Sequence, residues 1–158
     1  MASTLKNLSQ HSSKNITDMS SKKFGIVVSE WNDEVTEALF TGAVETLLEN
    51  GVNRDNIFRN SVPGSFELIL GGQWLAQEEA IDAVICLGCV IQGETRHFDF
   101  ICDAVAQGIK DVNLKFNKPV IFGVLTTDTQ QQALDRAGGK HGNKGDEAAI
   151  TAVKMLGF

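Results

Sequence analysis

The chain has 158 residues, of which 42% are apolar and 22% charged, and its formal net charge at pH 7 is −6. This length suits one domain with a buried core. The acidic balance argues against a general nucleic-acid binder, because such proteins neutralise phosphates with Lys and Arg. No apolar run approaches the ~20 residues that span a bilayer. We therefore expect no nucleic-acid partner and no membrane contact.

Residues 1–21 are polar, with repeated Ser and Asn and no hydrophobic periodicity. We interpret them as a flexible N-terminal arm, or as an extended segment that orders only against a partner. Residues 22–158 then form a single domain, whose pattern begins at Phe24. The arm has no apolar segment typical of a secretory signal. Three cysteines without such a signal fit a reducing compartment, so we expect a cytoplasmic protein.

In chain order, short β-rich runs alternate with longer helical patterns. The runs predict strands at residues 24–28, 57–62, 83–87 and 120–125. The first helical pattern is a stripe at Val35, Leu39, Ala43 and Leu47, and it ends at Asn50-Gly51, a good C-cap. The second helix has Ser65 as its expected N-cap and runs through Leu75. The remaining patterns predict a long helix over 101–116, a helix that starts near residue 128 or 129, and a last helix from about residue 144.

Apolar strands separated by helices indicate a parallel sheet that is covered on both faces. With right-handed crossovers we predict an α/β fold, a flavodoxin-like three-layer α/β/α sandwich whose four-stranded parallel sheet has the order 2-1-3-4. Ligands of such sheets bind beyond the carboxyl ends of the strands. The loops to inspect therefore follow Val28, Asn60, Gly88 and Leu125.

Cys86 and Cys89 form a C-x-x-C spacing, which is compatible with a redox pair. Reactive pairs of this kind lie at a helix N-terminus, which lowers the thiol pKa. Cys86 instead belongs to a predicted strand, and residues three apart on a strand point to opposite faces. We therefore interpret the cysteines as small core residues.

Several residues after the predicted strands suit a planar, anionic ligand. Trp31 offers a flat stacking surface, and Asn32, Ser65 and Glu67 can hydrogen-bond a polyhydroxylated chain. The segment 93–95 precedes a helix, whose N-terminus favours anions. Each feature also has a purely structural interpretation, because loop aromatics usually pack and glycine-rich turns need only backbone freedom.

Arg136 and His97 add charge and proton-transfer chemistry to this group. A guanidinium makes bidentate contacts with phosphate, and an imidazole titrates near neutrality, which suits a proton shuttle. A loop Arg is nevertheless often only solvated, and a lone His often lies at the surface. The residues alone support a protein that binds a planar anionic substrate, and no more.

Three longer segments carry a family resemblance: residues 62–68 (VPGSFEL), 88–99 (GCVIQGETRHFD) and 136–145 (RAGGKHGNKG). In order and spacing they are similar to the signatures of the lumazine synthases, from about Phe24 to the end of the chain. The resemblance implies a transferase of riboflavin biosynthesis. That family condenses 5-amino-6-ribitylaminouracil with 3,4-dihydroxy-2-butanone 4-phosphate to 6,7-dimethyl-8-ribityllumazine, releasing phosphate and water.

The resemblance also implies roles for individual residues. His97 moves protons, and Glu94, Thr95 and Arg136 bind the phosphate. The pyrimidine and ribityl chain of the substrate contact a larger set, in which Phe122 and Lys144 come from a neighbouring subunit: Trp31, Asn32, Ser65, Phe66, Glu67, Cys89, Val90, Ile91, Phe122 and Lys144. The chemistry needs neither a metal nor an organic cofactor, so we expect none.

Assembly is implied by the same resemblance. Pentamers are the common unit of the family, and many members build shells of twelve pentamers. The short segment 142–145 before the last helix resembles that of shell-forming members. Riboflavin synthase is a further candidate partner by resemblance.

Two other functions remain as alternatives. A flavin-binding shell of the same fold is suggested by Trp31, since many family members carry Phe there and such an aromatic has been linked to riboflavin binding. His97 and Arg136 argue against it, because storage needs no proton shuttle. A flavodoxin-like electron carrier needs a phosphate-binding loop after the first strand, and residues 29–32 (SEWN) lack the expected Ser, Thr and Gly.

Overall fold

The computed structural model describes residues 18–158, so the arm expected over residues 1–21 lies almost wholly outside the described residues. Met19 precedes the first strand and is buried in the hydrophobic core. Packing of the domain therefore begins ahead of Phe24, where the apolar pattern of the sequence starts. None of the helices in the described part of the chain is long and apolar enough to cross a membrane.

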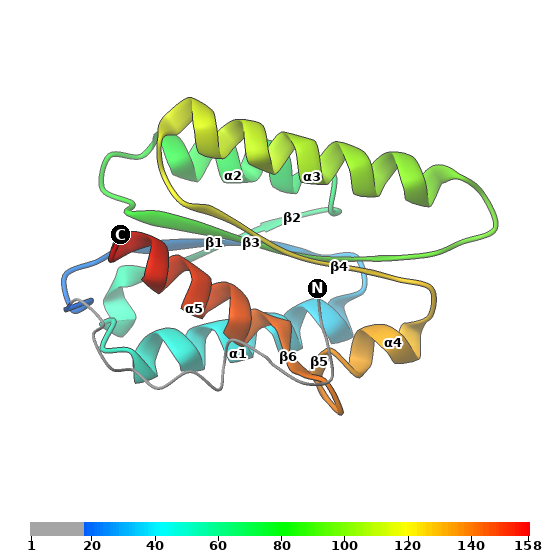
Figure 1. The fold of residues 1–158 in the computed structure, drawn as a ribbon, viewed down its shortest axis with the longest axis horizontal. Coiled ribbons are helices and arrows are strands. Elements are labelled where there is room, and N and C mark those ends of the chain that lie inside the picture. The colour runs from blue at the N-terminus through cyan, green and yellow to red at the C-terminus, as the bar shows by residue number, and fades with distance from the viewer. Residues whose placement is uncertain (1–17) are drawn as a thin grey trace.

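A parallel sheet forms the middle layer of the molecule (Figure 1). Within residues 18–158 it has four strands in the order β2-β1-β3-β4, which confirms the predicted topology. β1 and β3 are central and almost completely buried, whereas β2 is an exposed edge. The strands are β1 (Phe24–Ser29), β2 (Ile57–Val62), β3 (Ala83–Ile91) and β4 (Val120–Thr127).

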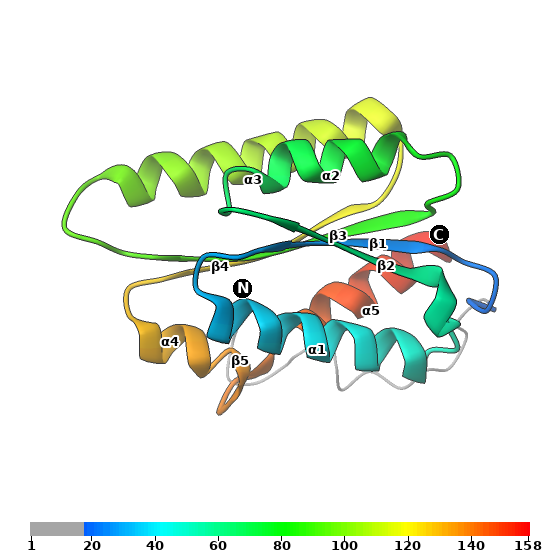
Figure 2. The ribbon, with the colours of Figure 1, turned by 180° about the vertical axis from the view of Figure 1, so that it is seen from behind.

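Helices cover both faces of the sheet (Figures 1 and 2). α2 and α3 pack on one face around the core residue Val27, and α1, α4 and α5 pack on the other around Ile26 and Val28. The alternation of β1 side chains between two cores is the expected result of strand geometry. The helices are α1 (Asp33–Glu49), η2 (Arg54–Asn56), α2 (Leu68–Gln77), α3 (His97–Phe116), α4 (Gln130–Leu134) and α5 (Lys144–Leu156).

β3 is longer than its apolar run predicted. Residues 88–91, expected in a loop, continue the strand and pair with β4 as far as Ile91 opposite Thr127. Backbone pairing with a neighbouring strand outweighs the glycine at position 88, which on its own weakens a strand. The extension carries Cys89 and its neighbours to the carboxyl edge of the sheet as ordered strand residues.

The start of α2 also differs from the prediction. Ser65 was expected as the N-cap, but the helix begins at Leu68 and its cap position is Glu67, without a side-chain cap. The carbonyl of Ser65 accepts a bond from the Leu68 amide at 3.2 Å, so its backbone closes a turn before the helix. The Ser65 hydroxyl is buried and makes no hydrogen bond among the described residues. At the end of α1 the prediction is confirmed, with Gly51 at φ 86°.

α5 approaches α1 very closely because of glycine. A Cβ at Gly145 would collide with the carbonyl oxygen of Leu39 in α1. The short hairpin of β5 (Ala137–Gly139) and β6 (Gly142–Asn143) leads into α5. Asn143 caps the helix by accepting from the Gly145 amide at 2.8 Å, and it donates to the Ala38 carbonyl at 2.9 Å. This contact fixes where α5, and Lys144 at its start, lie on the domain.

Candidate active site

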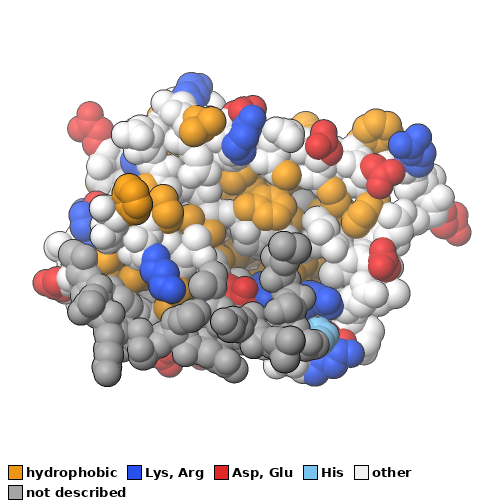
Figure 3. All heavy atoms as spheres, viewed as in Figure 1, with side chains coloured by type: hydrophobic (Ala, Val, Ile, Leu, Met, Phe, Trp, Pro, Cys, Tyr) orange, Lys and Arg blue, Asp and Glu red, His pale blue; other side chains and the backbone are white. Residues whose placement is uncertain are grey.

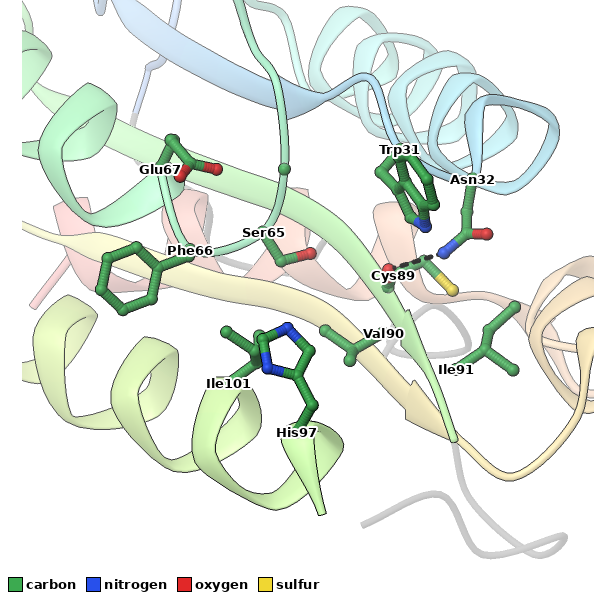
Figure 4. Close-up of a pocket in the computed structure, with 11 residues that line it drawn as sticks. Trp31, Asn32, Ser65, Phe66, Glu67, Cys89, Val90, Ile91, His97 and Ile101 are labelled. Carbon is green, nitrogen blue, oxygen red and sulfur yellow. Dashed lines mark hydrogen bonds between the residues drawn. The ribbon is translucent and has the colours of Figure 1, made fainter. Parts of the chain in front are cut away.

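The first pocket lies at the carboxyl ends of β1 and β3, where a parallel sheet is expected to bind ligand. It has a volume of about 600 Å³, which is large enough for a small molecule. Figure 4 shows Trp31 and Phe66 on opposite sides, with Ser65 and His97 between them. Its lining consists of Trp31, Asn32, Gly64, Ser65, Phe66, Glu67, Cys89, Val90, Ile91, His97 and Ile101.

Trp31 follows β1 and is 73% exposed, so its indole is free to stack on a ligand. Asn32 holds the turn beside it. Asn32 adopts the left-handed conformation at φ 63°, and its side-chain amide donates to the Cys89 carbonyl at 2.9 Å (Figure 4). The Trp31 amide donates to Pro63 at 3.1 Å. The aromatic side chain therefore projects from a backbone that is tied to both neighbouring segments.

The segment between β2 and α2 forms another wall of the first pocket. Ser65 is buried, whereas the Phe66 ring is half exposed and lies on the side of Ser65 away from Trp31 (Figure 4). Glu67 brings a carboxylate to the same wall. This combination of aromatic, hydroxyl and carboxylate groups suits a flat ligand with a polyhydroxylated substituent.

The end of β3 and the start of α3 complete the first pocket. Cys89, Val90 and Ile91 line it from the strand. His97 is the first residue of α3, and its imidazole projects into the cavity (Figure 4). Its backbone amide donates to the Thr95 hydroxyl at 3.4 Å, so Thr95 is engaged at the helix start.

The cysteines are not a redox pair. Cys86 packs in the core under α2 and α3, and Cys89 packs in the core under α1, so the two lie on opposite faces as predicted. Burial raises the pKa of the Cys86 thiol to about 12 and that of Cys89 to about 11. Redox-active thiols have lowered pKa values, and these cysteines are free.

A second hollow contains Phe122, Arg136 and Lys144, away from the first pocket. It is a depression of about 640 Å³ along the exposed side of β4, between α3 and α5. Figure 3 shows hydrophobic side chains gathered there in a band with basic groups below it. Its lining is Asn113, Val120, Ile121, Phe122, Gly123, Val124, Leu125, Thr126, Thr127, Arg136, Lys144, Glu147, Ala148, Thr151 and Met155.

The structure does not bring the expected phosphate-binding residues together within one chain. Glu94 and Thr95 are exposed in the loop between β3 and α3. Arg136 lies in the second hollow, where it donates to the Gln132 carbonyl at 2.9 Å. Lys144 lies there too, paired with Glu147.

Sequence reasoning missed two members of the first pocket, Gly64 and Ile101. Ile101 stands four residues after His97 on the same helix face, so the helical period could have identified it. Across the part of the chain that the structure describes, no group of three or more His, Cys, Asp or Glu side chains is arranged to hold a metal ion.

The fold and the first pocket together define a class: an α/β/α sandwich that binds a flat small molecule at the carboxyl edge of its parallel sheet. Comparisons with known proteins are more specific. Residues 21–158 match the family model for 6,7-dimethyl-8-ribityllumazine synthase. This match covers the whole domain, including every residue of both cavities.

Curated relatives agree. A 6,7-dimethyl-8-ribityllumazine synthase from Cytophaga hutchinsonii is 70% identical, covering 99% of this chain and 98% of the relative. Proteins of the same name from Parabacteroides distasonis and Flavobacterium johnsoniae are 53% and 56% identical, over 100% and 98% of this chain and 99% and 82% of the relatives. The chain belongs to the 6,7-dimethyl-8-ribityllumazine synthase family, a family of transferases in riboflavin biosynthesis.

Proposed function

We propose that this protein catalyses the condensation of 5-amino-6-ribitylaminouracil with 3,4-dihydroxy-2-butanone 4-phosphate. The products are 6,7-dimethyl-8-ribityllumazine, phosphate and water. Family membership supports this reaction. So does the first pocket, in which Trp31 faces the cavity as a stacking surface and Ser65 and Glu67 offer partners for a ribityl chain.

One observation carries the location of the complete site: among the described residues, the lining of the first pocket includes no Lys or Arg. A phosphorylated substrate needs cationic partners when it leaves water. Arg136 and Lys144 are available in the second hollow. We infer that the second hollow of one subunit closes the first pocket of its neighbour, so that Phe122, Arg136 and Lys144 join Glu94 and Thr95 across the interface.

The proposed mechanism asks little of the protein beyond positioning. The 5-amino group of the uracil attacks the ketone, and loss of water gives a Schiff base. Elimination then releases phosphate, and the ribitylamino nitrogen closes the ring with loss of a second water. His97, the first residue of α3, moves protons during these steps. Holding two reactants in a productive geometry supplies much of the acceleration.

The same proposal includes assembly and location. The exposed band at β4 needs a cover, because exposed apolar patches of this kind mark interaction sites. We propose pentamers, and a shell of twelve pentamers, as in the family resemblance described above. A cytoplasmic location and an association with riboflavin synthase complete the proposal.

The first test is product formation. Purified protein is mixed with both substrates, lumazine fluorescence is followed, and the uncatalysed rate is subtracted. Arg136→Ala should raise the Michaelis constant for the butanone phosphate about 10- to 100-fold, because it removes charge-assisted hydrogen bonds to phosphate. Arg54→Ala, which removes a guanidinium from the surface helix η2, is the matched control and should leave that constant unchanged.

Two outcomes count against the proposal. If the assembled protein does not accelerate product formation, the synthase activity is wrong and the flavin-binding shell is favoured. If Arg136→Ala leaves the Michaelis constant for the butanone phosphate unchanged, the phosphate site is wrong. Mixing experiments test the shared site separately. Oligomers reassembled from His97→Ala and Arg136→Ala chains should regain part of the activity that each variant lacks, since some interfaces then combine two intact halves.

A further inference from the structure

The side chain of Gln92 lies at the start of the loop that joins β3 to α3. Residues 92–96 are all exposed, and they include Glu94 and Thr95, to which we assign the substrate phosphate. The backbone amide of Gln92 donates to the Thr127 carbonyl at 2.8 Å, where the pairing of β3 with β4 ends. Gln92 is therefore anchored to the sheet, and the residues after it are not.

The side-chain amide of Gln92 bridges two carbonyl groups of this loop. Its nitrogen lies 2.8 Å from the Gly93 carbonyl oxygen and 3.4 Å from the Thr95 carbonyl oxygen. A carbonyl can only accept, so the NH₂ group of the glutamine faces both oxygens, and its two hydrogens match the two acceptors. The side chain thus cross-links positions 93 and 95 and ties them to the end of β3.

This bridge also sets the direction of two backbone amides. In a trans peptide unit the carbonyl and the following N–H point to opposite sides of the chain. Because the carbonyls of Gly93 and Thr95 face Gln92, the N–H groups of Glu94 and Arg96 point away from it. Neither of these N–H groups donates to any residue that the structure describes. They are therefore free to donate to a ligand.

Two more features of the loop fit a bound anion. A Cβ placed on Gly93 would meet nothing within 4 Å, so no contact among the described residues requires glycine there. Bare backbone allows a ligand to approach closely. The Thr95 hydroxyl accepts from the His97 amide at 3.4 Å and donates to none of the described residues. Free N–H and O–H donors at the start of a long helix suit a phosphate group.

We propose that Gln92 is a positioning residue for the phosphate of the substrate. It does not touch the phosphate. It holds the loop so that the donors of residues 94–96 already face the ligand before binding, which avoids the entropic cost of ordering a flexible loop at that moment. The inference rests on the proposed function, since that function supplies a phosphorylated substrate.

The test compares ligands with and without phosphate on the assembled protein. Gln92→Met keeps the length and the neutrality of the side chain and removes its N–H donors. It should weaken binding of inorganic phosphate, measured by phosphorus NMR titration, about 2- to 10-fold, the range for one hydrogen bond. The Michaelis constant for the butanone phosphate should rise by a similar factor. The value of kcat, the Michaelis constant for the uracil substrate and the affinity for 6,7-dimethyl-8-ribityllumazine should not change.

Two further variants make this test decisive. Gln73→Met is the matched control, because Gln73 also makes one side-chain bond, to Lys115 at 3.2 Å, and lines neither cavity. It should leave every constant unchanged. Gln92→Ala should reproduce the loss seen with Gln92→Met, so that the result does not depend on the fit of a methionine. Unchanged phosphate affinity in both Gln92 variants, or an equal loss for phosphate and the lumazine, would overturn the positioning role.

Failure of this inference differs from failure of the proposed function. If the unaltered protein forms product and Gln92→Met binds phosphate as well as it does, only the role of Gln92 is wrong. If the unaltered protein forms no product but phosphate binding falls in Gln92→Met, the proposed reaction is wrong and Gln92 still positions an anion site. Absence of phosphate binding to the unaltered protein would overturn the role of Gln92 outright.

Discussion

The first pocket and the second hollow are built in different ways. The first pocket rests on two central strands whose side chains are buried on both faces, and its Asn32 side chain is tied to the Cys89 carbonyl. The second hollow lies along the edge strand β4, and its Phe122 side chain is 42% exposed. One chain thus combines a pocket built on buried strands with a hollow that is still exposed to solvent.

This difference separates two tasks. Recognition of a flat heterocycle and a polyol needs shape and fixed hydrogen bonds, which a rigid sheet edge provides. Neutralising a phosphate needs cations, and these stand on α5 and on the segment before the β5–β6 hairpin. Changes in the first pocket should therefore alter rates and ligand selection, whereas changes in the second hollow should alter phosphate binding.

The largest expected effect is on turnover. His97→Ala should lower kcat about 10²–10⁴-fold, the usual contribution of general acid–base catalysis. The Michaelis constants should change much less, because the imidazole acts on protons rather than on binding. Steady-state kinetics with each substrate varied in turn measure this. His141→Ala, in the hairpin loop outside the first pocket, is the control; equal loss in both variants would remove His97 from its role.

A smaller effect is expected at the aromatic rim. Trp31→Ala should weaken binding of riboflavin and of the lumazine product about 2- to 10-fold, since aromatic stacking is worth about 0.5–1.5 kcal/mol beyond the area buried. Quenching of tryptophan fluorescence by riboflavin measures the interaction, and Trp74→Phe removes the other exposed indole as control. Quenching that persists in Trp31→Ala and vanishes in Trp74→Phe would place the flavin elsewhere.

The smallest effect concerns the reactivity of Cys86 and Cys89 in β3, the strand that ends at the first pocket. Since burial raises the pKa of Cys89 to about 11, its reactive thiolate is scarce at pH 8 and increases about tenfold for each unit of pH toward that value. Iodoacetamide should leave Cys86 and Cys89 unmodified at pH 8, as peptide mass spectrometry can establish. Rapid alkylation of Cys89 at that pH would mean that the end of β3 is not the rigid frame described above.

Much of this arrangement was predictable from the sequence, because it depends on local pattern. Apolar runs and helical stripes predicted the strands, the rule of right-handed crossovers in a flavodoxin-like sandwich predicted their order, and the loops at strand ends predicted Trp31, Ser65 and His97 as neighbours. What failed depends on contacts between distant segments. The extension of β3 to Ile91 requires pairing with β4. Ser65 is not the N-cap of α2, because its carbonyl closes a turn with the Leu68 amide and the helix begins only at Leu68.

The separation of Arg136 from the first pocket was equally out of reach of local pattern. Arg136 lies between α4 and β5, and its place in the second hollow depends on how this segment packs on the rest of the domain. A site shared between subunits leaves no periodic signal in one chain. The family resemblance implied that Arg136 binds phosphate. Its position outside the first pocket is the reason for our inference that it serves the pocket of a neighbouring subunit.

The contact between Gly145 and the Leu39 carbonyl determines how a substitution at position 145 would affect neighbouring subunits. Every missense change at codon 145 adds at least a Cβ, and that atom meets backbone rather than a side chain that can move aside. The helix that begins with Lys144 must then shift, and with it the cation that we assign to a neighbour's substrate. In an assembly that mixes altered and unaltered chains, the substitution would therefore impair sites to which an unaltered neighbour contributes the first pocket.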